Sequence, residues 1–172
     1  QWATKSVETG ATSETDGMYN MRKIRSLRRW QKDYPAFAWC ASLGEGWYLP
    51  AVEELQAISG QRLDIDKTLR TLRKTEITSW YGSSTQGNEV QARYVYMYTG
   101  YAGSKMEGND SYVRAVSAFN AKSSAISAQS NVSTAMSGSI TSAPYKVGDY
   151  YNDGTKEGIV FEVSNGGYNG KI

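Results

Sequence analysis

The sequence contains no histidine and only one cysteine, Cys40. Histidine is the commonest general base, the commonest transition-metal ligand and the usual titrating group near neutral pH. A single cysteine excludes an intrachain disulfide and a cysteine-cluster metal site. These absences weigh against acid–base catalysis, against a transition-metal site and against a pH switch near neutrality.

Long hydrophobic runs and a large net charge are also absent. No stretch approaches the ~20 apolar residues of a membrane helix, so we expect no membrane insertion in this chain. The formal net charge of +2 is too small to imply a polyanionic partner. The basic run Arg22–Lys32 alternates with a core stripe and adjoins no base-stacking platform, so we expect a solvated face and no nucleic-acid partner.

The composition favours one domain, or one domain with a tail, because 40% of the 172 residues are hydrophobic. Thirteen Tyr and five Trp stand against three Phe. Tyr and Trp combine an apolar body with a polar tip, which suits half-buried and ligand-facing surfaces. The chain starts with Gln and shows no signal peptide, so we expect a processed or excised product.

The first seventy residues predict short helices. Thr15 or Asp16 can cap a helix that runs to about Trp30. Pro35 suits the first turn of a second helix, and Gly44 suits the left-handed position after it. We further expect a strand at Trp47–Leu49, a helix at Val52–Gly60, and a helical piece marked by Ile65, Leu69 and Leu72.

From Ile77 the hydrophobic period changes to two, which predicts strands at Ile77–Tyr81, Val90–Tyr98 and Tyr112–Phe119. Glycine-bearing loops are expected at 82–89 and 99–111. In the second strand, Val90, Ala92, Tyr94, Tyr96 and Tyr98 share one face, and Gln91, Arg93, Val95 and Met97 share the other. The tyrosine face is either core or ligand-facing.

The composition divides the chain into a main body at 1–120, a linker at 121–144 and a terminal hairpin at 145–172. The linker holds eight Ser, five Ala and a single charged residue, Lys122. In the last part, Asn152-Asp153-Gly154 is a hairpin turn signal between two strands. A second turn at Ser164–Gly167 and a third strand at Tyr168–Ile172 follow.

A set of ordered motifs carries a family resemblance over residues 1–119. They are Thr9–Gly17, Trp39-Cys40, Leu43–Pro50 with Glu54-Leu55, Ser79–Thr85 and Val113–Phe119. Together they resemble a bacterial domain of unknown function with a C-type-lectin-like fold, related to the sulfatase-modifying-factor superfamily. The resemblance implies an α+β fold, with short helices packed on small, mostly antiparallel sheets. It also implies an extracellular or cell-surface location, secreted or anchored to an outer membrane.

The tail resembles the same family in an unusual order. Val147–Tyr151, Gly158–Phe161 and Gly170–Ile172 are similar to the hairpin that normally opens that domain. The chain is therefore interpreted as a circular permutation or as one period cut from a tandem array. A lone hairpin is marginal in water. The hairpin is therefore expected to complete the sheet of its own domain or that of a neighbouring copy, and both alternatives stay open.

The predicted site lies in the two loops that carry ligands in C-type-lectin-like folds. The candidate ligand-binding residues are Trp80, Tyr81, Ser83, Glu89, Tyr101, Asn109 and Asp110. Stacking of the aromatic rings on a sugar or peptide would be the chemistry of this site. The segment Glu107–Asp110 is similar to the Asn-Asp pair of calcium-dependent lectins, but the partner Glu-Pro-Asn motif is missing. We therefore interpret it as a polar turn and predict no metal.

The candidate catalytic groups have simpler interpretations. Cys40 lies in an apolar helical context, which predicts a buried thiol, and the related formylglycine-generating enzymes need a cysteine pair. Glu45, Glu53 and Glu54 are interpreted as solvated helix faces. We therefore predict no catalytic residue, no enzyme activity and no cofactor.

Three functions remain open. The first is a non-catalytic adhesion module of a bacterial surface protein, which binds a glycan or protein through aromatic loops. The second is a structural subunit of a fibre or array, in which residues 145–172 swap into another copy. The third is a diversified ligand-binding protein of a diversity-generating retroelement, since such proteins use this fold with Tyr-, Ser- and Asn-rich loops.

Overall fold

The computed structural model describes residues 1–121 and 144–172, so the predicted linker at 121–144 lies almost wholly outside the described residues. The described residues form an α+β structure with five α-helices and small antiparallel sheets. The helices are α1 (Gly17–Arg25), α2 (Trp30–Asp33), α3 (Pro35–Ser42), α4 (Val52–Gly60) and α5 (Arg62–Thr71). The general α+β class is therefore confirmed.

Helix α1 begins where the sequence predicts, because the Asp16 side chain accepts a hydrogen bond of 2.7 Å from the Tyr19 amide. The predicted continuation to Trp30 is wrong. The helix ends at Arg25, Ser26 caps it, and Arg29 adopts a left-handed conformation (φ 61°) before α2 starts. The break turns α2 and α3 so that Tyr34 and Phe37 reach the core.

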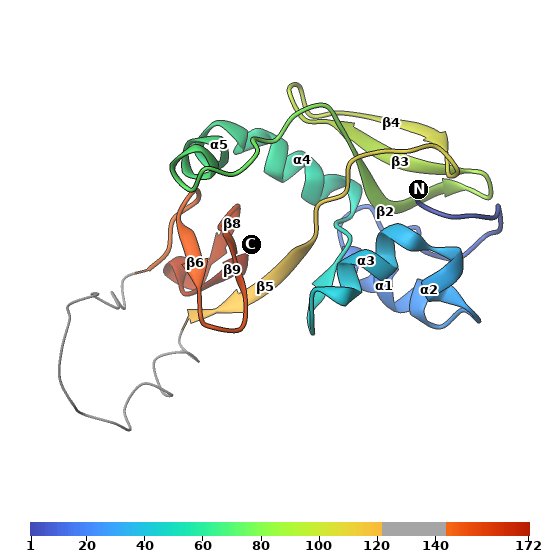
Figure 1. Cartoon of the computed structure of the whole chain (residues 1–172), viewed down its shortest axis with the longest axis horizontal. Helices are drawn as coiled ribbons and strands as arrows, with labels where there is room; N and C mark the ends of the chain where they lie inside the picture. The colour runs from blue at the N-terminus through green and yellow to red at the C-terminus, as the bar shows by residue number, and fades with distance from the viewer. Residues whose placement is uncertain (122–143) are drawn as a thin grey trace.

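Strands from both ends of the chain share one sheet. Its order is β1 (Trp47–Tyr48), β5 (Val116–Asn120), β9 (Asn169–Lys171) and β8 (Glu162–Ser164). A second sheet contains β2 (Trp80–Asn88), β3 (Gln91–Tyr96) and β4 (Tyr101–Met106), and a small hairpin pairs β6 (Tyr150–Asn152) with β7 (Glu157–Ile159). A 3₁₀ turn, η1 (Asn165–Gly167), joins β8 to β9. Figure 1 shows the β2–β3–β4 sheet above α1–α3, with the C-terminal strands at the other end of the molecule.

Both predicted loops contain strand residues, which corrects the sequence interpretation. Residues 82–88 continue β2, and β4 occupies much of 99–111, whereas the predicted strand from Ile77 begins only at Trp80. The polar stretch Ser83–Gln86 is buried because distant groups satisfy it. Thr85 Oγ1 donates to the Ser13 carbonyl at 2.8 Å, and the Ser84 amide donates to the Pro50 carbonyl at 2.7 Å.

Strand β3 shows which of its two predicted faces is buried. Val95 and Met97 are fully buried, whereas Tyr94 and Tyr96 are half-buried and Tyr98 is exposed. Ala92 is the buried member of the tyrosine set, and the β2–β3 register shifts beside it, between Gly82 and Gln86. The tyrosines therefore lie outward, away from the main core.

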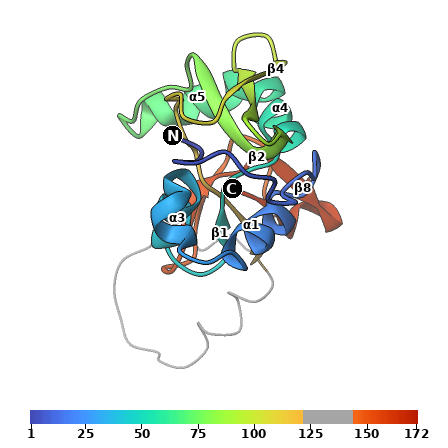
Figure 2. The same cartoon turned by 90° about the vertical axis from the view of Figure 1, so that its right-hand side faces the viewer.

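The main core lies between the helices and the two larger sheets. Trp2 fills its N-terminal side, with ring centroids 5.1 Å from Phe37 and 5.8 Å from Tyr34 in edge-to-face geometry. Figure 2 shows the N-terminal segment running between the β2–β3–β4 sheet and helices α1 and α3. An irregular segment is therefore part of the packing and holds the sheet to the helices.

The C-terminal segment packs against its own chain in this structure. Strand β9 pairs with β5 through Ala118↔Lys171 and with β8 on its other side. Phe161 joins the main core, and Tyr151, Val160 and Ile172 form a smaller cluster with Phe119. The hairpin turn at Asn152–Gly154 and the turn before β9 form as the sequence predicts.

Candidate ligand-binding site

Five aromatic side chains from β2, β3, β4 and the turn between β3 and β4 lie together on the outer face of the second sheet. Pairing places Trp80 opposite Tyr96, and Tyr96 opposite Tyr101. The Trp80 ring centroid lies 4.4 Å from that of Tyr96 and 4.9 Å from that of Tyr94. We call this surface the aromatic face; its members are Trp80, Tyr94, Tyr96, Tyr98 and Tyr101.

Glycines make room for the central tyrosine of the aromatic face. Tyr94 is paired with Gly82 on one side and with Gly103 on the other. A Cβ atom on Gly103 would lie 2.7 Å from the Tyr94 hydroxyl oxygen, so the ring lies across this glycine. The Tyr94 ring therefore depends on the absence of a side chain at position 103.

A shallow hollow of about 300 Å³ opens beside the aromatic face. Trp80 and Tyr112 contribute its aromatic walls, with 37% and 61% of their surfaces exposed. Its polar groups come from Ser79, Lys105, Asp110 and Ser111. We call it the Trp80 hollow. Aromatic walls with a few convergent polar groups are typical of a site for a small polar ligand.

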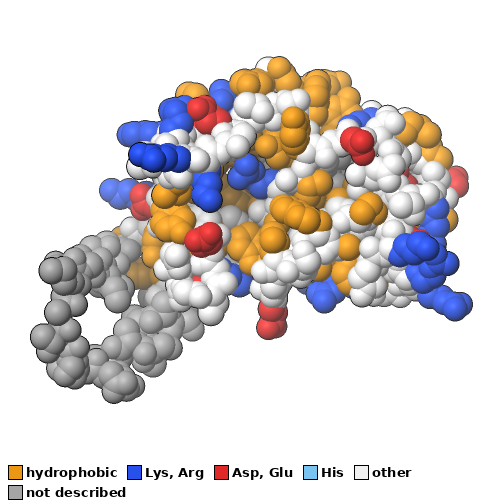
Figure 3. Space-filling model, viewed as in Figure 1, with side chains coloured by type: hydrophobic (Ala, Val, Ile, Leu, Met, Phe, Trp, Pro, Cys, Tyr) orange, Lys and Arg blue, Asp and Glu red, His pale blue; other side chains and the backbone are white. Residues whose placement is uncertain are grey.

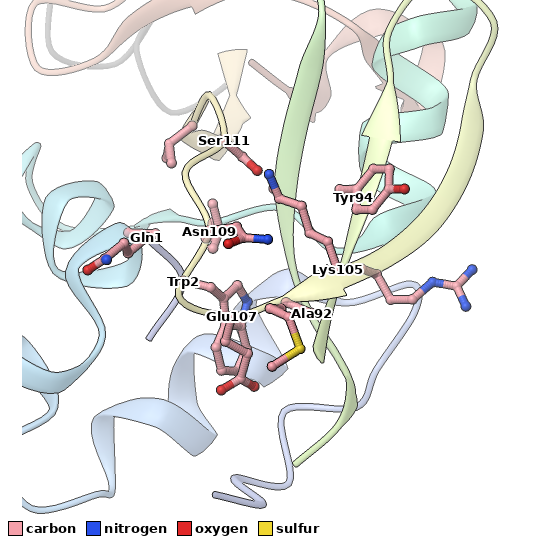
Figure 4. A pocket seen from close by; sticks show the side chains of 14 residues that line it. Gln1, Trp2, Ala92, Tyr94, Lys105, Glu107, Asn109 and Ser111 are labelled. Carbon is pink, nitrogen blue, oxygen red and sulfur yellow. The ribbon is translucent and has the colours of Figure 1, made fainter. Parts of the chain in front are cut away.

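Main-chain contacts hold the segment 110–112 against the edge of β2. The Tyr112 amide donates to the Trp80 carbonyl at 3.1 Å, and the Gly82 amide donates to the Tyr112 carbonyl at 3.0 Å. Lys105 donates to the Asp110 carbonyl, and its ammonium lies 5.8 Å from the Tyr94 ring centroid. Figure 4 shows the Lys105 side chain reaching toward Ser111.

Burial lowers the pKa of Lys105, while the nearby Asp110 carboxylate opposes this shift. The ammonium is thus partly removed from solvent at the wall of the Trp80 hollow. A cation and a carboxylate beside exposed rings can donate to and accept from the hydroxyl groups of a ligand.

The structure brings together some of the predicted site residues and separates others. Trp80 and Asp110 line the Trp80 hollow, and Tyr101 lies 6.3 Å from Trp80 between ring centroids, with 60% of its surface exposed. Asn109 is exposed beside Asp110.

Glu89, Tyr81 and Ser83 do not line the Trp80 hollow, although the buried Tyr81 ring lies 5.6 Å from the Tyr112 ring between centroids. Glu89 is exposed at the opposite end of the β2–β3 hairpin from Trp80. Tyr81 is buried on the other face of β2, and Ser83 is buried, donating to the Arg93 carbonyl at 3.0 Å. Lys105, Ser111 and Tyr112 were not among the predicted site residues. Lys105 is positioned by the pairing of β4 with β3, and Ser111 and Tyr112 by the contact between residues 81 and 112.

Glu107 was interpreted as part of a polar turn, but its side chain is buried beside the N-terminal segment. The Trp2 amide donates to the Glu107 carbonyl at 3.1 Å, and the Gln86 amide group donates to its carboxyl Oε1 at 2.9 Å. Figure 4 shows Glu107 and Trp2 on the same side of a small pocket. Burial raises the pKa of the Glu107 carboxyl to about 7, and the Gln86 hydrogen bond only partly offsets this.

Glu107 is therefore expected to make the stability depend on pH. Its folded pKa lies above the ordinary value of 4.5, so the free energy of unfolding falls as pH rises from about 4.5 to about 7. Glu107→Gln removes this ionisation. Relative to the wild type, we expect the variant to gain about 1–2 kcal/mol between pH 5 and pH 8, a range reduced for solvent screening.

Urea denaturation at both pH values measures this change. Glu89→Gln, which alters an exposed carboxylate on the neighbouring turn, is the control and should leave the pH dependence unchanged. An equal stability difference between Glu107→Gln and the wild type at both pH values would contradict the assigned ionisation.

Cys40 and Glu54, two of the candidate catalytic groups considered from the sequence, are both buried. Cys40 is fully buried, and burial raises the pKa of its thiol to about 12, so the thiol stays protonated at neutral pH. The interpretation of Glu54 as a solvated group is wrong. It is buried, and its carboxylate accepts from the Gly17 and Ala51 amides and from the Tyr48 hydroxyl.

In residues 1–121 and 144–172, no group of three or more Asp, Glu, Cys or His side chains could hold a metal ion. Among the helices described, none has the length and apolar content needed to cross a bilayer.

Comparison with known proteins found no matching family model, no matching curated protein and no matching solved structure.

Proposed function

We propose that the chain is a non-catalytic binding module that recognises a glycan at the Trp80 hollow. The observation that carries the proposal is the placement of two exposed rings, Trp80 and Tyr112, around a polar floor with Asp110 and Lys105. Large exposed aromatic groups that are not needed for the core favour a recognition surface.

The chemistry of the hollow matches a saccharide better than an apolar ligand. A sugar ring presents C–H groups on its faces and hydroxyl groups at its rim. The rings of Trp80 and Tyr112 can cover the faces, while Asp110 accepts and Lys105 and Ser111 donate hydrogen bonds to the rim. The aromatic face continues from Trp80 to Tyr101, which provides room for a second sugar unit.

The cellular setting of this proposal rests on the family resemblance. A C-type-lectin-like domain of a secreted or surface-anchored bacterial protein would meet glycans outside the cell. In that setting, the five-residue aromatic face and the Trp80 hollow form one continuous adhesion surface. Neither a catalytic step nor a cofactor belongs to the proposed function.

A glycan array with the purified chain tests the proposal. Trp80→Ala is expected to weaken binding to the best glycan by about fivefold to 150-fold, if a sugar on the ring contributes about 1–3 kcal/mol, as base–aromatic stacking does. Trp39→Ala is the matched control, since Trp39 is 48% exposed on α3, outside the residues that line the hollow.

The proposal fails if no glycan binds or if Trp80→Ala and Trp39→Ala behave alike. If no glycan binds but peptides from a library bind and lose binding in Trp80→Ala, the ligand of the hollow is a protein and not a glycan. Asp110→Asn separates the polar from the stacking contribution. We expect this variant to bind a different set of glycans. Its folding stability should stay close to that of the wild type, because the Asp110 side chain is exposed.

A further inference from the structure

A second cavity, of about 210 Å³, lies between α4, α5, β5 and the β6–β7 hairpin. It shares no lining residue with the Trp80 hollow. Figure 3 shows the same face of the molecule as Figure 1, hollowed below α5, with hydrophobic and basic side chains around the recess. This cavity is independent of the proposed glycan site.

The walls of this cavity are largely apolar and come from distant parts of the chain. Ile65 and Leu69 contribute from α5, Val116 from β5, and Phe161 and Ile172 from the C-terminal segment. All five are buried. An apolar cavity of about 150 Å³ is large enough to bind a benzene ring, so this one has room for an apolar group somewhat larger than a phenyl ring.

Two cationic side chains, Lys74 and Arg114, also line the cavity. Among residues 1–121 and 144–172, neither forms an ion pair, and the rest of the sequence contains no Asp or Glu. The buried Arg114 Nε has no hydrogen-bond partner in the described structure, and the guanidinium lies 5.9 Å from the Tyr81 ring centroid. A partly buried guanidinium without an anion favours binding of one.

The acidic group of the lining already has a partner. Glu157 accepts a hydrogen bond of 2.6 Å from the Tyr150 hydroxyl at the edge of the cavity. Lys74 is exposed and Arg114 is half-buried, so the positive charges extend from the surface inward. The cavity thus combines an apolar interior with two available positive charges.

We propose that this cavity binds a small monocarboxylate with an apolar body. The apolar body occupies the space between α5, β5 and Phe161, and the carboxylate pairs with Arg114 and Lys74. Arginine binds a carboxylate through two parallel hydrogen bonds, and lysine adds a point charge. Aromatic acids and medium-chain fatty acids belong to this class.

Isothermal titration calorimetry of the whole chain with phenylpropionate and with octanoate tests this proposal. We expect saturable binding of at least one acid at a single site. Phenylpropanol, which has the same ring without the charge, should bind about tenfold more weakly or worse, since it lacks the charge-assisted hydrogen bonds that a carboxylate makes with Arg114. Equal binding of the acid and the alcohol would overturn the proposal.

Variants locate the binding. Arg114→Gln and Lys74→Gln should each weaken acid binding, and Lys74 is exposed, so its replacement leaves folding intact. Lys67→Gln, an exposed change on α5 outside the lining, is the control. Trp80→Ala should bind the acid as the wild type does, which separates this site from the glycan site. Absence of binding by both acids, or full binding by both charge variants, would refute the proposal.

Discussion

Glu54→Ala is expected to lower the free energy of unfolding by about 3–5 kcal/mol, because it removes a buried, ion-paired carboxylate. The buried carboxylate accepts from the Gly17 amide at 3.0 Å and from the Ala51 amide at 2.8 Å, which are groups at the starts of two helices. Its other oxygen lies 3.0 Å from the Lys171 ammonium. Removal leaves the Gly17 and Ala51 amides without this acceptor, while Lys171 keeps its second ion pair, with Glu162 at 3.0 Å.

Urea denaturation measures this loss. Glu53→Ala is the matched control, because Glu53 is the exposed neighbour on α4, and its replacement should change stability by no more than about 0.5 kcal/mol. Lys171→Met should also destabilise the fold, since it leaves the Glu54 carboxylate buried without its cation. If Glu54→Ala were no more harmful than Glu53→Ala, the carboxylate would not hold the helices, β1 and β9 together.

Trp2→Ala is expected to cost about 3–5 kcal/mol, as for other large aromatic residues in a core. Trp2 is buried, packs edge-to-face on Phe37, and donates from its indole nitrogen to the Ser83 carbonyl at 2.8 Å. Trp2→Phe keeps much of the apolar contact but leaves the Ser83 carbonyl unpaired. It should therefore cost less, about 1–3 kcal/mol.

The exposed Trp39 is again the control, because Trp39→Ala removes an indole that contributes little to the core. Thermal or urea unfolding of the three variants checks the expected order of destabilisation, in which Trp2→Ala costs most, Trp2→Phe less and Trp39→Ala least. Equal stability of Trp2→Ala and Trp39→Ala would show that the N-terminal segment does not bind the second sheet to the helices.

Local signals account for the part of the fold that the sequence predicts. Asp16 caps α1, Pro35 starts α3, and Gly44 adopts a positive φ after α3. The hairpin turn at Asn152–Gly154 depends on the same kind of short-range chemistry. Each of these features is determined by residues a few positions apart, so a single sequence is enough to predict them.

Long-range pairing accounts for what the sequence could not predict. The polar stretch Ser83–Gln86 is typical of a loop, but its partners include Ser13, Pro50 and the segment near Thr9, which only the folded chain brings near. The sequence around Glu54 is typical of a solvated helix face, but in the folded chain its carboxylate contacts the Gly17 amide and the Lys171 ammonium. The period of β3 identifies two faces, but not the one that the core covers.

The candidate site also combines residues that the sequence predicts with residues that only long-range contacts bring together. Trp80 and Asp110 were predicted as site residues and both line the Trp80 hollow, whereas Tyr112 and Lys105 complete it through contacts made across the sheet edge. Trp80 and Tyr81 are neighbours in a strand, so their side chains point to opposite faces. Once β2 is known to begin at Trp80, only one of the two can belong to the exposed aromatic face.

The position of β9 between β5 and β8 has a consequence for the order of folding. During synthesis β5 leaves the ribosome well before residues 169–171, so its pairing edge stays open while the nascent chain lengthens. Contacts between such distant segments form slowly, and an open strand edge can pair with another chain in the meantime. Until β9 docks, the nascent chain therefore carries an unpaired edge on β5 that is open to pairing with another chain.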